Sequence, residues 1–401
     1  MLELEEAIAR ILGAIPPPIS ETVSLMAAHH RVLVDSVTAE IDLPCFDNSA
    51  MDGYAIRSSD AAQANRKSPV PLRMMGRVAA GETFSGRVVP GSCVRIFTGS
   101  PLPEGADAVV MQEDTLTDPE QPQQILVTES VKPWENVRFR AEDVQRGALL
   151  ARRGEILRAG TLSLLAAAGI DSVKVGKQPR IAMLATGSEL REAGEGLESG
   201  QIYESNRVGL VALARDAGGL ARIFPLVPDN PESVRSALEN AFNETDAVVT
   251  SGGVSVGEMD LVKSALENAG GAVQFWRVAV KPGRPFVFCH YAGKLLFGLP
   301  GNPVSALVTF MLLVRPALLR WQGLADVSLI ANPGVLREPL ANPGQRRHFM
   351  RVKVDRHGNV SSAGIQASHI LSSLEAANGL VDVPPGTTLQ PGTNVQVIRW
   401  D

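Results

Sequence analysis

Between residues 180 and 320, short apolar runs alternate with helical patterns and with small turns that contain glycine. Arg180–Ala185, Ala247–Val249 and Leu295–Leu299 have the composition of buried strands, and a helical pattern follows each of them. The first of these helices is predicted to begin at the turn Thr186–Leu190. Alternation at this spacing predicts a mostly parallel sheet with helices on both faces. Ligands of such sheets bind outside the carboxyl ends of the strands, so the turns after these strands are candidate sites.

The turn after Ala247–Val249 is built of small residues and leads to two carboxylates. It reads Thr-Ser-Gly-Gly-Val-Ser-Val-Gly over 250–257, and Glu258 and Asp260 follow. Glycines allow backbone conformations in which successive N–H groups converge on an anion. Acids at this position also favour the start of a helix. From this stretch alone, a ligand site and a simple helix start remain open alternatives.

Two further turns carry groups that suit an anion. Val280–Pro285 is a rigid turn with two cations, Lys281 and Arg284. Leu299-Pro-Gly-Asn-Pro303 ends a strand, with Asn302 as a possible helix cap and Pro303 at the first helical position. A helix that begins there would direct free N–H groups at the same crevice. Either cation alone indicates surface charge, but beside two such turns they indicate a clamp for phosphate or another oxyanion.

The composition limits the class of protein. The chain has 401 residues, enough for more than one core, and a formal net charge of −5, which argues against a broad nucleic-acid footprint. Its three cysteines lie far apart without a Cys-x-x-Cys pair, as expected of reduced thiols in the cytoplasm. The acidic N-terminus is unlike an export signal. Val304–Leu319 is interrupted by Arg315 and Pro316 and falls short of the roughly 20 residues of a membrane span, so a buried helix is predicted.

The sequence on either side of the α/β region has the texture of strands and turns. Residues 69–137 contain short β-rich runs separated by Gly and Pro, which predict a compact sheet or barrel. After Trp321 the pattern returns to strands, which predicts a small β domain at the C-terminus. The predicted fold class is therefore multidomain: a central α/β domain with a mostly parallel sheet, flanked by β-rich modules.

A set of motifs in a fixed order covers nearly the whole chain: Phe46–Ala55, Thr98-Gly99, Arg138–Asp143, Thr186–Leu190, Thr250–Gly257 with Asp260, Lys281–Pro285 and Leu299–Ala306. In this combination the sequence resembles the MoeA family of molybdopterin molybdenumtransferases, which includes the E domain of gephyrin. The resemblance implies a homodimer whose chain has four parts. These are a discontinuous linking domain (1–47 with 139–175), an inserted β-rich domain (48–138), an α/β molybdopterin-binding domain (176–324) and a C-terminal β-barrel-like domain (325–401).

The resemblance also implies a reaction, in which adenylylated molybdopterin and molybdate are converted with Mg²⁺ to molybdenum cofactor and AMP. Matching motif positions implies catalytic roles for Asp260, Asp52, Asp143 and Lys281 and a Mg²⁺ site at Asp260, Glu189 and Asp229. The implied substrate-binding residues are Thr98, Arg138, Thr186, Gly187, Gly252, Gly253, Ser255, Arg277, Arg284, Pro300, Gly301, Asn302, Pro303 and Ser368. The implied protein partners are the upstream adenylyltransferase and recipient molybdoenzymes, with no nucleic acid and no membrane.

The sequence departs from the family pattern at a few positions. Ser188 stands where an acid is commoner, and Arg277 and Arg284 stand where related sequences often carry Lys. A planar guanidinium differs from a point charge, which puts the oxyanion geometry in question. Two alternative functions remain, a molybdopterin adenylyltransferase and a gephyrin-like scaffold without catalysis. The sequence does not decide between molybdate and tungstate.

Overall fold

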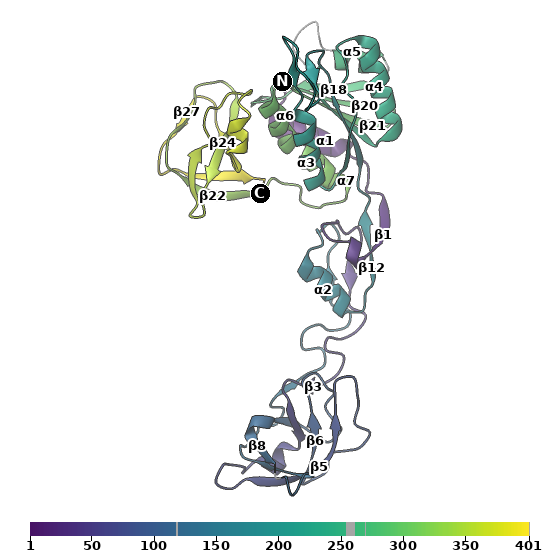
Figure 1. Ribbon diagram of the computed structural model, residues 1–401, viewed down its shortest axis with the longest axis vertical. Coiled ribbons are helices and arrows are strands. Elements are labelled where there is room, and N and C mark those ends of the chain that lie inside the picture. Colours follow the sequence, from purple (N-terminus) through teal and green to yellow (C-terminus); the bar gives the residue numbers. More distant parts are fainter. Residues whose placement is uncertain (118, 254–260, 269, 401) are drawn as a thin grey trace. The chain divides into compact units, whose positions relative to one another are not determined.

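Figure 1 shows the computed structural model, which describes residues 1–117, 119–253, 261–268 and 270–400. The chain forms two compact units. The first contains Met1–Asp35, Arg153–Leu157 and Val173–Asp401, and the second contains Ser36–Arg152 and Arg158–Ser172. The chain leaves the first unit and later returns to it, so both units are discontinuous in sequence. The four-part division predicted from the sequence stays a prediction.

The centre of the first unit is a six-stranded sheet with the order β16-β13-β17-β21-β20-β18. The pairs β16/β13, β13/β17 and β17/β21 are parallel, while β20 runs antiparallel to both of its neighbours. The prediction of a mostly parallel sheet is therefore confirmed. The strands are β13 (Arg180–Ala185), β16 (Leu220–Ile223), β17 (Ala247–Ser251), β18 (Ala272–Arg277), β20 (Pro285–Tyr291) and β21 (Lys294–Leu299).

Helices cover both faces of this sheet (Figure 1). One core cluster joins α1, α3, α6 and α7 to one face, and a second joins α4 and α5 to the other. Helix α4 begins at Pro231, where the Asn230 side chain caps it by accepting a hydrogen bond from Ser233 N at 2.9 Å. The helices are α1 (Leu4–Ala14), α3 (Asn206–Asp216), α4 (Pro231–Glu244), α5 (Leu261–Asn268), α6 (Pro303–Thr309) and α7 (Arg315–Trp321).

The segment after β13 differs from the prediction. No helix begins at Thr186–Leu190; instead β14 (Leu190–Arg191) pairs with β15 (Ile202–Tyr203). The next helix is α3, which starts at Asn206, as the helical pattern over residues 206–217 predicts. Backbone bonds hold the turn open, since Gly187 N donates to the Val227 carbonyl at 3.1 Å. Ser188 and Asp229 exchange two bonds: Ser188 N donates to Asp229 Oδ2 at 3.2 Å and Asp229 N donates to Ser188 Oγ at 3.0 Å. Contacts between distant turns thus override the local helical pattern.

One helical run, Pro303–Trp321, is long and apolar enough to cross a membrane by length and composition. It consists of α6, a π-helical turn (Phe310–Val314) and α7. About 78% of its most apolar window is buried inside the protein, where Phe310, Leu312 and Leu318 are inaccessible. A buried position of this kind is what a core helix requires.

The C-terminal part of the first unit is a small closed sheet. Its strands follow the order β24-β25-β22-β28-β26, and β26 pairs again with β24, which closes the barrel. A short strand of the α/β region, β19 (Val280–Lys281), adds to β24 in parallel. The remaining elements are β22 (Ala331–Leu336), β23 (Leu340–Asn342), β24 (Arg347–Val354), β25 (Asn359–Ser362), α8 (Ser372–Glu375), β26 (Gly379–Val383), β27 (Thr387–Leu389) and β28 (Asn394–Arg399).

The second unit is built on a six-stranded sheet with the order β7-β4-β6-β5-β9-β8. Two short antiparallel pairs, β3 with β10 and β2 with β11, and helix α2 (Ala159–Ala167) complete it. This arrangement confirms a β-rich module. Its strands are β2 (Val37–Thr38), β3 (Asn48–Ser49), β4 (Gly53–Ile56), β5 (Val70–Val78), β6 (Ser92–Ile96), β7 (Ala108–Met111), β8 (Thr115–Thr117), β9 (Gln124–Val127), β10 (Val137–Arg138) and β11 (Leu149–Ala151). A further pair, β1 (Ser20–Ser24) with β12 (Ser172–Gly176), belongs almost wholly to the first unit.

Candidate functional site

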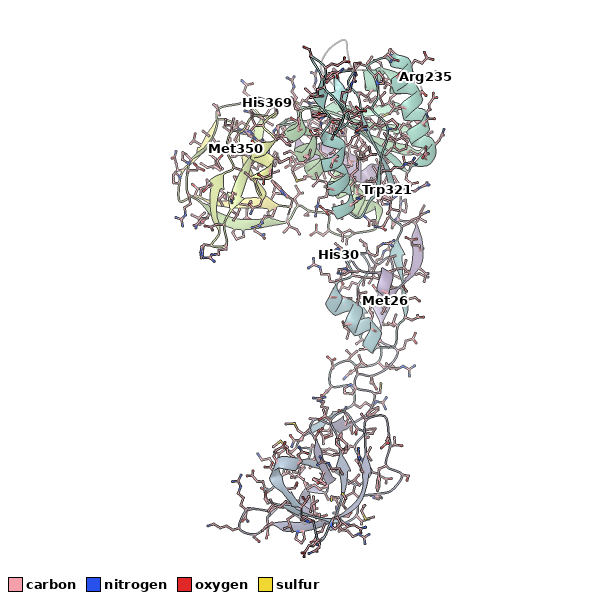
Figure 2. The ribbon with its side chains drawn as sticks, viewed as in Figure 1. Met26, His30, Arg235, Trp321, Met350 and His369 are labelled. Atoms are coloured by element: carbon pink, nitrogen blue, oxygen red, sulfur yellow. The ribbon has the colours of Figure 1, made fainter. Side chains whose placement is uncertain are left out.

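A cavity of about 640 Å³ lies at the carboxyl ends of β13, β17 and β21. This is the edge of the sheet at which the sequence predicts a ligand. Of the predicted site residues, the following line it: Thr186, Glu189, Asp229, Gly252, Gly253, Pro300, Gly301, Asn302 and Pro303. His369 of the C-terminal domain, labelled in Figure 2, also lines it. The cavity is therefore lined by residues of the α/β domain and of the C-terminal domain, which belong to the same compact unit.

The glycines of the first turn are required by its geometry. Gly252 and Gly253 have φ values of +87° and +69°, in the region that side chains rarely adopt. A Cβ on Gly252 would lie 2.6 Å from the Thr186 carbonyl oxygen, and one on Gly253 would lie 2.6 Å from Val262 Cγ2. The two turns after β13 and β17 can therefore approach each other only with glycine at these positions.

Asn206, which the sequence analysis did not single out, ties two walls of the cavity together. Its amide nitrogen donates to Ser251 Oγ at 2.7 Å and to the Gly301 carbonyl at 2.8 Å. Its own carbonyl oxygen is buried and has no hydrogen-bond partner among the described residues. A buried acceptor without a partner is costly, so this oxygen is available for a donor on a ligand.

A buried ion network fixes Asn206. Glu204 accepts hydrogen bonds from the backbone N–H groups of Asn206 and Arg207, at 2.6 and 2.9 Å. The Arg207 side chain, 1% exposed, donates to Glu204 at 2.9 Å, to both oxygens of Glu192 at 2.8 Å and to the Phe224 carbonyl. A buried charge is tolerated only when its donors and acceptors are satisfied, as they are in this network.

The helix α6 offers fewer donors than predicted. Asn302 makes no side-chain capping bond, Pro303 has no N–H, and Val304 N donates to the Ser368 carbonyl at 3.2 Å. The predicted cap at Asn302 is therefore wrong. Ser368 instead contacts the start of the helix through its backbone, which joins the C-terminal domain to this wall of the cavity.

A cluster of five basic residues lies where β19 joins β24. We call Lys281, Arg284, Arg346, His348 and Arg351 the basic cluster. Lys281 is in register with His348, and Arg346 Nη1 donates to the Val280 carbonyl at 2.9 Å. None of the five side chains lines the cavity, but Pro285, which follows Arg284 in the sequence, does. The prediction of a cationic clamp named two of the five members; the other three come from β24 and the residue before it.

Several side-chain nitrogens of the basic cluster are buried and unpartnered in the described part of the chain. These are both ring nitrogens of His348 and the Nε and Nη1 atoms of Arg351, in side chains 2% and 0% exposed. The Arg351 Nη2 atom alone is used, by the carbonyls of Ile365 and Ala367 at 2.8 and 3.2 Å. Burial and the charge of Arg284 lower the pKa of Arg346. Like charges held together with spare donors indicate a site for an oxyanion.

His348 makes stability depend on pH. Burial first, and then the charges of Lys281, Arg351 and Arg346, lower its pKa from 6.5 to about 4. Below pH 6.5 the unfolded chain binds a proton that the folded protein does not, so stability falls as the pH drops from 6.5 toward 4. We expect the thermal midpoint of the wild type to fall between pH 7 and 5, and that of His348→Gln to fall less. Equal falls in both proteins would contradict this role of His348.

Arg277 and Gly187 lie close to the site without lining the cavity. The Arg277 guanidinium packs on Trp276, with Cζ 4.2 Å from the ring centroid, and its buried Nε has no partner among the described residues. A Cβ on Gly187 would lie 2.8 Å from Glu189 Oε2, so this glycine makes room for that carboxylate.

Two of the three predicted metal ligands lie in the described part of the chain. Glu189 and Asp229 both line the cavity, whereas Asp260 lies outside the described residues, as do Ser255 and Glu258. Within the described residues, no group of three or more His, Cys, Asp or Glu side chains gathers in a metal-binding arrangement. Two carboxylates facing a polar cavity are hard oxygen donors of the kind Mg²⁺ prefers, and Mg²⁺ usually completes its shell with water and substrate phosphate. The residues present thus fit the ion without forming a complete cage.

The predicted residues of the β-rich module form a separate set in the second unit. Asp52 Oδ1 accepts hydrogen bonds from both the backbone N–H and the hydroxyl of Thr98, each at 2.8 Å. These bonds hold the pKa of Asp52 below its usual value, and the charge of Arg95 adds to the effect. Arg138 on β10 pairs with Asn48, and Asp143 N donates to the Leu43 carbonyl. Both side chains are exposed. The structure brings Asp52 and Thr98 together. A contact between the β-rich module and the cavity stays a prediction.

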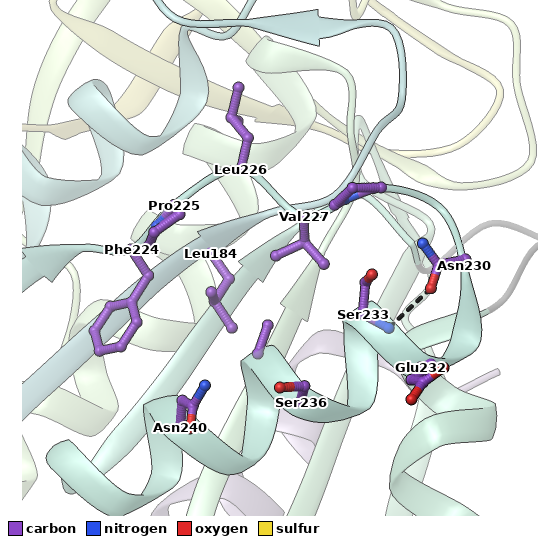
Figure 3. A pocket seen from close by; sticks show the side chains of 12 residues that line it. Leu184, Phe224, Pro225, Leu226, Val227, Asn230, Glu232, Ser233, Ser236 and Asn240 are labelled. Carbon is purple, nitrogen blue, oxygen red and sulfur yellow. Dashed lines mark hydrogen bonds between the residues drawn. The ribbon is translucent and has the colours of Figure 1, made fainter.

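A second groove of about 490 Å³ lies beside α4 and is shown in Figure 3. Ser233, Ser236 and Asn240 of the helix face Phe224 and Val227 across an apolar floor. Its only charged lining residue among those described is Glu232. This groove therefore lacks the cations that phosphate or molybdate needs, and the cavity at the strand ends is the better candidate.

Comparisons with known proteins agree with this geometry. Residues 2–169 match the MoeA N-terminal region (domain I and II), 182–320 match a probable molybdopterin binding domain, and 333–400 match the MoeA C-terminal region (domain IV). The chain is 38% identical to the molybdopterin molybdenumtransferase of Haemophilus influenzae over 98% of both chains. This chain belongs to the MoeA family. It is an enzyme of molybdenum cofactor biosynthesis, a molybdopterin molybdenumtransferase.

Other members of the MoeA family support the same assignment. Molybdopterin molybdenumtransferase 2 of Mycobacterium tuberculosis is 37% identical over 100% of this chain and 98% of its own. The crystal structure of the MoeA protein of Pyrococcus horikoshii superposes with a TM-score of 0.85 at 32% identity, covering 100% of this chain and 99% of that one. The family resemblance and the fold class inferred from the sequence are thereby confirmed.

Proposed function

We propose that the protein inserts molybdenum from molybdate into adenylylated molybdopterin and releases AMP. The observation that carries this proposal is the basic cluster with its buried, unpartnered nitrogens, which continues in sequence into Pro285 of the cavity wall. Molybdate is a tetrahedral dianion, and guanidinium, imidazole and ammonium groups are the donors that bind such an oxyanion. The arginines at 277 and 284 keep the charge that lysines supply in related sequences.

The cavity suits the organic substrate. The Gly252–Gly253 turn exposes backbone where a phosphate can approach closely, and the free oxygen of Asn206 can accept a bond from a pterin N–H. Thr186 Oγ1 is likewise buried without a partner among the described residues, which adds a hydroxyl that a ligand can use. The same cavity therefore has acceptors for a heterocycle and donors for its phosphates.

Glu189 and Asp229, with Asp260, would hold Mg²⁺. When bound, the ion would supply a Lewis acid and a template for the phosphoanhydride. The chain's own residues orient this site: Ser188 holds Asp229 through two hydrogen bonds, and Gly187 makes room for Glu189. Ser188, a departure from the family pattern, would thus position a metal ligand here instead of serving as one.

The family resemblance also supports a homodimer in which Asp52 and Asp143 act from the β-rich module. The Asp52 carboxylate is kept ionised by Thr98, as a group acting beside a metal-bound phosphate needs to be. Light scattering of the purified protein measures the dimer directly. A cytoplasmic location and contacts with the upstream adenylyltransferase and recipient molybdoenzymes remain predictions from the sequence.

Turnover by the purified protein tests this function. We expect AMP release from adenylylated molybdopterin and Mg²⁺ only when molybdate is added, with molybdenum cofactor as the second product. Replacing molybdate by tungstate measures the choice between the two oxyanions. If the protein instead forms adenylylated molybdopterin from ATP and molybdopterin, it is the adenylyltransferase. If it catalyses neither reaction, the result favours the alternative of a scaffold protein without catalysis.

A further inference from the structure

One face of the β-rich module carries a row of arginine and aromatic side chains that the function above does not use. On neighbouring strands, Tyr54 of β4 is in register with Arg95 of β6, and Arg95 is in register with Arg77 of β5. Residues directly opposite each other on paired strands point to the same face of a sheet. The three side chains therefore form one row across three strands.

An irregularity in β5 creates this row. The register between β5 and β6 shifts between Met74 and Gly76. Before the shift, Leu72 and Met74 pack with Cys93 and Tyr54 in the core of the module. After it, Arg77 instead of an apolar residue stands opposite Arg95. Bulges that redirect one side chain are typical of functional edges of sheets.

The two guanidiniums share an aromatic ring. The Cζ atoms of Arg77 and Arg95 lie 5.0 and 5.1 Å from the centroid of Phe97, and Arg95 Cζ also lies 4.8 Å from that of Tyr54. Arg95 Nη2 further donates to Gln112 Oε1 at 2.5 Å. These contacts fix the position of both cations before any ligand arrives.

Within the described part of the module, neither Arg77 nor Arg95 forms a direct ion pair, although the charge of Arg95 acts on Asp52. The module's described ion pairs involve other arginines: Arg66 with Glu129, Arg87 with Glu104 and Arg140 with Asp42. Arg77 is exposed and Arg95 is partly exposed. Two preorganised guanidiniums that form no direct ion pair in the described module have spare N–H donors that match the oxygens of a phosphate.

The row ends beside the predicted catalytic acid of the module. Phe97 directly precedes Thr98, whose N–H and hydroxyl both bond Asp52, and Gln112 N donates to the Asp52 carbonyl at 3.1 Å. Arg95, Gln112, Thr98 and Asp52 therefore form one connected group. A phosphate held by the arginines would lie on the same face as Asp52.

We propose that Arg77 and Arg95, stacked on Phe97, bind the phosphate of the AMP product. This inference rests on the proposed function for the identity of the ligand. Arg95 and Arg77 would thus be binding residues supplied by the β-rich module.

Calorimetric titration of the full chain with AMP tests the proposal. We expect Arg77→Gln and Arg95→Gln each to weaken AMP binding by at least about tenfold, as loss of a charge-assisted hydrogen bond predicts. Arg73→Gln is the matched control, because Arg73 is an exposed arginine on the same strand without a described ion pair, and it should bind AMP as the wild type does. Molybdate binding should be unchanged in all three variants.

The possible results test the phosphate site independently of the proposed function. Wild-type affinity for AMP in both variants, or no AMP binding by the wild type, overturns the phosphate site even if molybdate-dependent turnover is present. Arg77 is exposed, so a loss confined to Arg95→Gln, with a lower thermal midpoint, indicates misfolding and also counts against the proposal. If light scattering shows a changed molecular mass for both variants while AMP binding is unchanged, the row of side chains contacts a second copy of the chain instead of AMP.

Discussion

Lys281→Ala is expected to lower molybdate-dependent AMP release by about 100-fold, the cost of removing one charged donor from a preorganised oxyanion site. Lys281 belongs to the turn that joins β24 of the C-terminal barrel, in register with His348. Its ammonium is exposed, so it can reach a ligand, and its loss creates no buried cavity. The defect should therefore lie in binding and turnover, with the thermal midpoint little changed.

The variant also distinguishes molybdate from phosphate as the ligand of Lys281. Titrations with molybdate and with adenylylated molybdopterin should show a larger loss for molybdate. Equal losses would indicate that Lys281 contacts the phosphates instead. Lys353→Ala serves as the control, because Lys353 is an exposed lysine on β24, the strand that pairs with β19, and lies outside the basic cluster. If both variants turn over like the wild type, the basic cluster is not the molybdate site.

The α/β sheet and its cavity were predictable because their signals are local. Apolar runs such as Ala247–Val249 end at glycine turns, and the parallel order of β13, β17 and β21 follows from the helices between them. Since parallel strands end at one edge, Thr186, Gly252 and Pro300 necessarily come together there. The described part of the site agrees with that reasoning.

The rest of the basic cluster was not predictable in the same way. Arg346, His348 and Arg351 lie in an alternating strand pattern that predicts ordinary β structure. Their role depends on the parallel pairing of β24 with β19. These strands are distant in sequence, since Arg346 and Val280, which are joined there by a hydrogen bond, are 66 residues apart. No short-range pattern encodes such a pairing. The one available signal was the density of cations over Arg346–Arg351, which a solvated strand shows as well.

The absence of a helix after Thr186 has a similar cause. The sequence Thr-Gly-Ser-Glu-Leu has the acids and hydroxyls of a helix start, yet Ser188 bonds the Asp229 backbone instead of its own. Tertiary hydrogen bonds thus compete with local capping and win. The next helix begins 20 residues after Thr186, at Asn206, where Glu204 accepts its first free N–H groups.

Arg207→Met is expected to have the largest effect on stability. Removing the guanidinium leaves the buried carboxylate of Glu204 without its main counter-ion, which typically costs about 3–5 kcal/mol. Methionine fits the space of the arginine stem, so the loss reflects charge more than volume. For a domain of this size we expect the thermal midpoint to fall by roughly 6–15 °C. Scanning fluorimetry that follows Trp276 and Trp321 reports on the α/β domain.

Arg180→Met is the matched control for this charge effect. Arg180 also pairs with an acid, Asp246, at 2.8 Å, but its side chain is 52% exposed, so its loss should cost at most about 1 kcal/mol. The two variants also differ in their expected effect on the site, because Glu204 orients Asn206, which ties Ser251 to Gly301. Arg207→Met should therefore weaken pterin binding even at temperatures where it is folded, and Arg180→Met should not. Equal, small shifts in the two midpoints would show that Glu204 is neutralised by protonation or hydration without Arg207, and that the network is not what holds the cavity in shape.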